Sequence, residues 1–161
     1  MQRDGQRDFD FFMGTWSVHN RRLERPLSGS WSWYEFGGTA IARPVWGGNA
    51  NVDEVDFESP LGRIEGLTLR LYDQKTREWS LYWGTRARGL MPVPNVGAFD
   101  ERGVGDFFSR ELFEGRPIIC RYRWCDVTPE SCRWEQAFSA DDGATWELNW
   151  TMQFTRRDAA A

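Results

Sequence analysis

The sequence is poor in the side chains that most often bind metals and carry protons. Its 161 residues include one histidine, His19, and three cysteines, Cys120, Cys125 and Cys132. No CxxC pair and no Cys/His spacing typical of zinc sites is present, and a lone imidazole gives no pair of histidine ligands. The sequence therefore predicts no metal site and no cofactor, with three free thiols in a reducing compartment.

Long apolar runs are also missing. The first residues, MQRDGQRDFDFF, lack the hydrophobic stretch of a signal peptide, and no run reaches the length of a membrane-spanning helix. The net charge of −4 argues against binding to nucleic acid or to an anionic membrane surface, because phosphates attract basic faces. These features predict a cytoplasmic protein with neither nucleic acid nor membrane as partner.

Aromatic side chains are what the chain has in excess, with ten Trp and eleven Phe. Hydrophobic residues make up 40% and charged residues 27%, which favours a folded domain over disorder. Trp is large and carries an N–H that needs a partner, so it suits the wall of a cavity as well as a core. Two interpretations stay open: the Trp residues fill the core, or several of them line a ligand cavity.

Short alternating segments follow one another at regular intervals, separated by turn signals such as Asp141-Asp142-Gly143. No segment of useful length has the helical period. About ten strands at this spacing predict an all-β fold. A single closed antiparallel up-and-down β-barrel is favoured because closure removes unpaired edges. The predicted strands are 15–21, 31–43, 51–57, 66–72, 78–83, 96–99, 104–113, 117–125, 132–139 and 145–154.

The domain is predicted to span residues 8–155, between a flexible N-terminus (1–7) and a flexible C-terminus (156–161). Phe9, Phe11 and Phe12 form an apolar cluster in residues 8–13 that predicts a short helical turn. This turn either plugs one end of the barrel or anchors the N-terminus on the core. Residues 86–94, with one Gly and two Pro, are predicted to be a loop.

Alternation in the last three strands separates charged from apolar side chains. One face, predicted to form the outer wall, carries Arg121, Arg123, Arg133, Glu135 and Glu147. The opposite face is predicted to point inward and carries Cys120, Tyr122, Trp124, Trp134, Gln136, Phe138, Trp146, Leu148, Trp150 and Met152.

The triplet Gly14-Thr15-Trp16 resembles the G-x-W signature of lipocalins and other calycin barrels, in which the Trp closes the narrow end. The run 11–16 also resembles the opening of nitrobindin-like haem barrels. Resemblance to uncharacterised bacterial lipocalin-like proteins includes residues 19–23, 51–54 and 133–138. It implies a lipocalin-like barrel that binds a small, largely apolar ligand. Nitrobindin-like haem binding needs an axial His on a late strand, and His19 lies on the first one.

Residues 139–146, SADDGATW, match the S-x-D-x-G-x-T-W Asp-box pattern and resemble hairpins of sialidases. The pattern specifies a turn in which Asp and Ser side chains bond to the backbone and Gly takes a positive φ. A single copy without a basic triad indicates no glycosidase activity. The chain also has no G-x-S-x-G elbow and no phosphate-binding glycine loop.

Candidate proton carriers are His19, Glu35 and Glu54. Alternation most simply places His19 outward. It places Glu35 on the same face as Trp33, a face that we expect to point inward, and it requires that one of Asp53 and Glu54 faces the interior. A carboxylate among Trp rings would have a raised pKa and could act as a general acid or base. Pairing with an arginine would instead make it structural.

Three functions remain open at this point. The favoured one is binding of a small apolar or aromatic molecule, and the second is a cofactor-free isomerase, cyclase or lyase in the same cavity. The third is a structural or interaction module. A homodimer is compatible with the sequence. The predicted ligand-binding residues are Asn20, Trp33, Glu35, Trp83, Tyr122, Trp134, Gln136 and Trp150.

Overall fold

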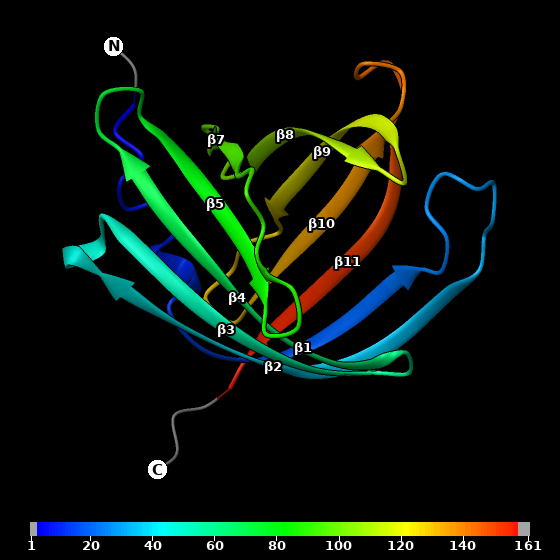
Figure 1. The fold of residues 1–161 in the computed structure, drawn as a ribbon. Coiled ribbons are helices and arrows are strands. Elements are labelled where there is room, and N and C mark those ends of the chain that lie inside the picture. Colours follow the sequence, from blue (N-terminus) through cyan, green and yellow to red (C-terminus); the bar gives the residue numbers. More distant parts are fainter. Residues whose placement is uncertain (1–2, 158–161) are drawn as a thin grey trace.

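Alternating side chains and tight turns fold the chain into a closed antiparallel β-barrel, seen in a computed structural model that describes residues 3–157 (Figure 1). Each strand of the barrel pairs with the next one along the chain, and β11 pairs with β1 to close the ring. The barrel strands in this range are β1 (Gly14–Leu23), β2 (Trp33–Val45), β3 (Ala50–Ser59), β4 (Gly62–Asp73), β5 (Glu78–Thr85), β7 (Asn95–Phe99), β8 (Gly105–Phe113), β9 (Arg116–Cys125), β10 (Ser131–Ser139) and β11 (Glu147–Arg156). The predicted fold class is confirmed.

Three short elements accompany the barrel. The 3-10 helix η1 (Asp10–Phe12) precedes β1, and η2 (Trp46–Gly48) joins β2 to β3. The predicted loop 86–94 contains a two-residue strand, β6 (Gly89–Leu90), which pairs with the end of β5 outside the ring. No helix within residues 3–157 is long and apolar enough to cross a membrane.

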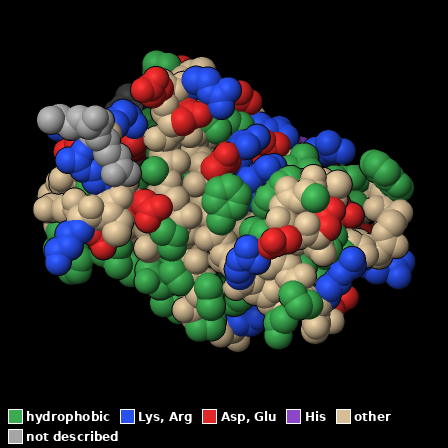
Figure 2. Space-filling view, turned by 90° about the horizontal axis from the view of Figure 1, so that it is seen from above, with side chains coloured by type: hydrophobic (Ala, Val, Ile, Leu, Met, Phe, Trp, Pro, Cys, Tyr) green, Lys and Arg blue, Asp and Glu red, His purple; other side chains and the backbone are tan. Residues whose placement is uncertain are grey.

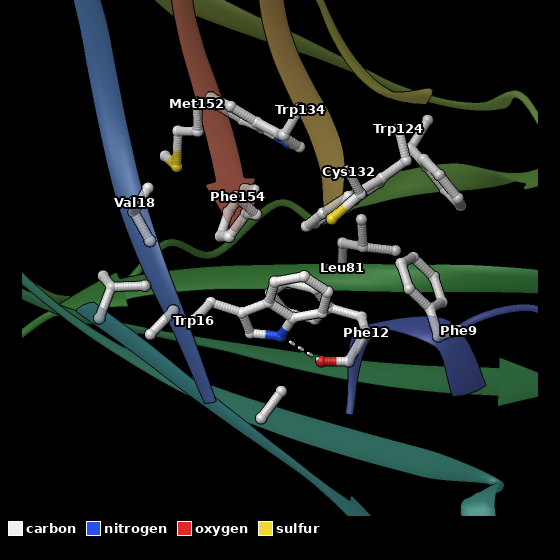
Figure 3. Close-up of a cluster of buried hydrophobic side chains, with 14 of the residues drawn as sticks. Phe9, Phe12, Trp16, Val18, Leu81, Trp124, Cys132, Trp134, Met152 and Phe154 are labelled. Atoms are coloured by element: carbon white, nitrogen blue, oxygen red, sulfur yellow. Dashed lines mark hydrogen bonds between the residues drawn. The ribbon is translucent and has the colours of Figure 1, made fainter. Parts of the chain in front are cut away.

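One end of the barrel is closed by η1 and by Trp16. The Trp16 side chain is fully buried, stacks on Phe12 with ring centroids 5.6 Å apart, and donates a 2.8 Å hydrogen bond from Nε1 to the Phe12 carbonyl (Figure 3). The Arg156 guanidinium lies 4.1 Å from the centroid of the Trp16 ring and donates to the carbonyls of Met13 and Phe11. The apolar cluster is therefore a plug.

The segment before η1, predicted to be flexible, lies against this closed end. Tyr72 Oη accepts a 3.0 Å hydrogen bond from the Gly5 backbone N–H, and Trp79 Nε1 donates a 2.9 Å bond to the Gly5 carbonyl. Two inward-facing side chains of β4 and β5 thus fix the chain. The remaining predicted ends, residues 1–2 and 158–161, lie outside the described residues.

Acidic and basic side chains are interspersed on the face of the molecule that Figure 2 shows. Arg123 forms two hydrogen bonds of 2.7 and 2.9 Å with Asp106, and Arg133 pairs with Glu135. Glu147 instead accepts a hydrogen bond from the backbone N–H of Leu27, in the loop between β1 and β2. A cross-strand pair such as Arg123–Asp106 contributes about 0.2–1 kcal/mol, whereas Arg133 and Glu135 lie on the same strand, β10.

The prediction that Trp146 points inward is wrong. Its ring lies 6.1 Å from that of Phe108 and 4.7 Å from the Arg121 guanidinium, on the outer wall. The register between β10 and β11 shifts between Gln136 and Ala137. Such a bulge changes the parity of every residue beyond it, so the alternation that holds for Trp150 does not extend back to Trp146.

The Asp-box turn between β10 and β11 forms as predicted. Asp141 accepts hydrogen bonds from the Thr145 hydroxyl (2.5 Å), the Thr145 backbone N–H (2.8 Å) and the Ser139 hydroxyl (2.8 Å). Gly143 has a φ of 92°. The hydrogen bonds from Thr145 contribute most to lowering the pKa of Asp141 to about 2.

A pH titration tests this turn. Because the Asp141 pKa is lowered in the folded chain from its ordinary value of 3.8, its contribution to stability is fully present above pH 3.8 and is lost as the pH falls through about 2. We expect carboxyl NMR to give a pKa near 2 for Asp141. Thr145→Val should move this pKa upward, toward 3.8. An unchanged pKa in that variant would contradict the assigned cause.

Candidate functional site

A cavity lies inside the barrel, directly above the closed end. Its lining comes from β3, β4, β5, β9, β10 and β11, and nearly half of the lining residues are aromatic. This deep part is small, with a cavity volume of about 50 Å³. Its aromatic lining consists of Trp83, Tyr122, Trp124, Trp134, Trp150 and Phe154.

The cavity widens toward the open end of the barrel. Trp83, Tyr122, Gln136 and Trp150 line both the deep part and this wider part, which has a cavity volume of about 700 Å³. The turn between β3 and β4 and the segment 86–93 border it. The interior is thus hollow and can be reached from solvent.

Contacts between the aromatic rings hold the wall of the cavity. The Trp150 ring stands edge-on to Trp134, with centroids 5.5 Å apart at 90°, and to Trp83, with centroids 6.5 Å apart at 86°. Edge-to-face pairs of this kind are favoured by the charge distribution of the rings. A Cβ atom at Gly66 would clash with the Trp83 ring. Glycine at this position therefore lets Trp83 lie against β4.

Two side chains of β1 contact Trp150, one at its indole N–H and the other on the face of its ring. Asn20 is fully buried and accepts a 2.9 Å hydrogen bond from Trp150 Nε1. The Arg22 guanidinium lies 4.2 Å from the Trp150 ring centroid, where a cation on the ring face is attracted. Trp150 is therefore fixed in position before any ligand binds.

A buried ion pair separates the cavity from the plug. Arg70 on β4 donates hydrogen bonds of 2.5 Å to Asp53 and 3.0 Å to Asn51, and the side chains of Arg70 and Asp53 are only 3% and 4% exposed. The guanidinium also lies 5.1 Å from the ring centroid of Phe9. Asp53 is thus the inward member of the pair Asp53/Glu54, and Glu54 is exposed on the outer wall.

Near the open end, a second carboxylate lies beside buried polar groups. Glu111 on β8 borders the wide part of the cavity and accepts a 3.0 Å hydrogen bond from the Ser109 hydroxyl. Burial, followed by the charges of Cys120 and Glu111, raises the pKa of Tyr122 well above its ordinary value. Burial also raises the pKa of the Cys120 thiol. The Tyr122 hydroxyl and the Cys120 thiol therefore stay protonated at neutral pH.

The predicted ligand-binding residues separate into two groups. Those that lie on the inner side of the wall are Asn20, Trp83, Tyr122, Trp134, Gln136 and Trp150. Trp33 and Glu35 lie on the outer wall, where Arg21 stacks over Trp33 and forms a 3.1 Å ion pair with Glu35. The expected inward direction of Glu35 is wrong, because Tyr34 and Phe36 are the residues of this stretch that pack toward the core.

The predicted proton carriers are all remote from the cavity. His19 faces outward, as alternation predicts, and its Nε2 lies 3.6 Å from the exposed Glu35. Glu54 is also exposed. The sequence did not identify Arg70 or Glu111 as cavity residues. Arg70 alternates with Leu69 and Leu71, and this pattern suggests that the leucines, and not the arginine, face the interior. Across residues 3–157, no cluster of three or more His, Cys, Asp and Glu side chains is arranged to hold a metal ion.

Comparison with known proteins shows the fold. No protein-family model and no curated protein sequence matches the chain. The S-type phycobiliprotein lyase CPES from Guillardia theta matches with a TM-score of 0.63 and 13% identity over 94% of this chain and 92% of that one. A de novo designed fluorescence-activating β-barrel matches with a TM-score of 0.46 and 13% identity over 97% and 100% of the two chains.

A third match is EF1p2_mFAP2b bound to DFHBI, with a TM-score of 0.47 and 11% identity over 94% and 98% of the two chains. At 13% identity, the similarity to the lyase carries information on fold and none on activity. The nearer resemblance to bacterial lipocalin-like proteins and nitrobindin-like barrels stays a prediction. The chain thus has a closed antiparallel β-barrel fold like that of the S-type lyase.

Proposed function

We propose that the barrel binds a small, largely apolar or aromatic molecule in its interior. The observation that supports this most strongly is the hollow, reachable cavity walled by Trp83, Trp134 and Trp150. Small-molecule sites are typically concave and mostly apolar, with a few placed polar groups. A flat molecule would lie against these rings, and the amide of Gln136 would orient it.

The position of Arg22, which lines the wide part of the cavity, also supports the proposal. Together with Asn20 it fixes the Trp150 ring at the place where the deep and wide parts of the cavity meet. A ring that is already immobilised loses little side-chain entropy when a ligand binds, which favours affinity. The arrangement therefore fits a binding surface better than a core that only fills space.

Binding is also favoured over the cofactor-free enzyme. That alternative depended on His19, Glu35 or Glu54 to move a proton inside the barrel, and all three lie on its outer wall. A general acid or base must come within hydrogen-bond reach of the proton it transfers. The carboxylates that line the cavity already have partners: Asp53 pairs with Arg70, Glu65 with Arg86, and Glu111 accepts a hydrogen bond from the Ser109 hydroxyl.

A fluorescence titration with a panel of flat aromatic compounds tests the proposal. We expect 2-ethylnaphthalene, as one member, to quench the Trp emission of the wild type. Trp150→Ala should weaken its binding about tenfold, because loss of one aromatic contact and its buried area is worth roughly 1.4 kcal/mol. The measurement is the dissociation constant, with folding checked by circular dichroism.

Trp31→Ala is the matched control, because the Trp31 side chain is 89% exposed and lies outside the cavity. This variant should bind the probe as the wild type does. Absence of quenching by every compound of the panel would contradict the proposed function, as would an equal loss of affinity in both variants.

A further inference from the structure

The buried polar atoms of the barrel show an imbalance between donors and acceptors. Within residues 3–157, the buried side-chain nitrogen and oxygen atoms without a hydrogen-bond partner are all nitrogens that carry hydrogen: Asn20 Nδ2, Arg70 Nε, Arg121 Nε, Trp124 Nε1 and Asn149 Nδ2. Buried donors are normally satisfied, because leaving one unpaired is unfavourable. Acceptor atoms from outside the chain, of water or of a ligand, can satisfy such donors.

Two of these donors line the deep part of the cavity. Arg70 and Trp124 are each 2% exposed, and the Arg70 guanidinium carbon lies 5.5 Å from the centroid of the Trp124 ring. Hydrogen bonds to Asp53 and Asn51 fix the guanidinium through its two terminal nitrogens. Arg70 Nε and Trp124 Nε1 are therefore two unpaired N–H groups on residues that line the deep part of the cavity.

The charge at this place restricts the acceptor to a neutral atom. Arg70 already forms an ion pair with Asp53, so a second anion would be buried beside Asp53 with one cation for two negative charges. A donor group on the ligand would find little to bind, because Asp53 already accepts from Arg70 and from the Thr68 backbone N–H. A carbonyl oxygen, with two lone pairs, matches two N–H donors.

We propose that the deep end of the cavity is a subsite for a neutral carbonyl oxygen of the ligand, which accepts hydrogen bonds from Arg70 Nε and Trp124 Nε1. This inference rests on the proposed function and narrows its ligand to an aromatic or apolar ketone, amide or lactam that enters with the carbonyl first. The rings of Trp134 and Trp150 then contact the body of the molecule.

A matched pair of probes tests the subsite. 2-Acetylnaphthalene and 2-ethylnaphthalene share the same ring system and nearly the same shape, and only the first carries a carbonyl. We expect the full chain to bind the ketone more tightly than the hydrocarbon. Trp124→Phe keeps an aromatic ring and removes one donor, so it should reduce this preference about three- to tenfold. Calorimetry gives the two dissociation constants.

Trp150→Phe is the control, because it changes a ring of the same cavity whose N–H is already bonded to Asn20. It should weaken the binding of both probes alike and leave their ratio unchanged. Infrared spectroscopy of the wild type with ¹³C-carbonyl-labelled 2-acetylnaphthalene needs no variant. The bound C=O stretch should lie below its frequency in a hydrocarbon solvent.

The outcomes separate the two proposals. Binding of both probes with equal affinity, or a ratio that Trp124→Phe leaves unchanged, overturns the carbonyl subsite and leaves the binding function standing. A bound carbonyl stretch equal to that in hydrocarbon solvent does the same, and would mean that water satisfies the two donors. Failure of both probes to bind contradicts the proposed function for naphthalene-sized ligands, and the subsite with it.

Discussion

Asp53→Asn is expected to lower the free energy of unfolding by about 3–5 kcal/mol, because it leaves the Arg70 charge buried without a counter-charge. The pair lies between the plug and the cavity, with side chains 3% and 4% exposed, so water cannot screen the charge. Arg70 also lies against the rings of Phe9, Phe12 and Trp124 and cannot turn to solvent without disturbing the plug. Urea unfolding followed by far-UV circular dichroism measures the loss.

The same strand provides a matched control. Asp56 forms two hydrogen bonds of 2.8 and 2.6 Å with Arg63, but this pair lies on the outer wall with side chains 46% and 63% exposed. Asp56→Asn should lower the free energy of unfolding far less than Asp53→Asn, because solvent screens the charges of an exposed pair. A similar small loss at both positions would show that Arg70 is solvated in the native state, which would contradict the buried pair.

The double variant Asp53→Leu/Arg70→Met separates charge from packing. Replacing both members of a buried ion pair by apolar side chains of similar size is often neutral or stabilising. We therefore expect the double variant to regain most of the stability lost in Asp53→Asn. It would also remove one donor from the floor of the cavity.

The barrel could be predicted because its signals are local. Turn residues and two-residue alternation indicate where each strand begins and ends, and the Asp-box specifies its own hairpin through Ser139, Asp141 and Gly143. The G-x-W triplet placed Trp16 at the closed end. Each of these features depends on contacts within a few residues of chain or on one face of one strand.

The direction of each face could not be predicted in the same way. Alternation defines two faces of a strand but not which one points inward, and β2 carries aromatic side chains on both. Trp33 and Glu35 were therefore expected inside, whereas Tyr34 and Phe36 pack toward the core. In β4 the apolar and the charged side chain lie opposite to what their polarity suggests: Leu67 is exposed, and Arg70 is buried.

The deep site depends on the register between strands, which the sequence does not contain. Asp53 reaches Arg70 because β3 and β4 pair so that Asp53 stands opposite Thr68, two residues from Arg70. Trp124 comes to the same place from β9, on the opposite side of the ring of strands. Only the closed barrel brings these three side chains together, so no pattern within one segment could identify them.

Trp16→Ala is expected to destabilise the barrel by about 3–5 kcal/mol, the range for deleting a large buried aromatic side chain. The change removes the stacking on Phe12, the hydrogen bond to the Phe12 carbonyl and the ring beneath the Arg156 guanidinium. Trp46→Ala, at a Trp that is 74% exposed, should change the free energy of unfolding by less than about 0.5 kcal/mol. Guanidinium chloride unfolding compares the two variants. If both variants lost the same small amount of unfolding free energy, this would contradict the conclusion that Trp16 closes the end of the barrel below the cavity.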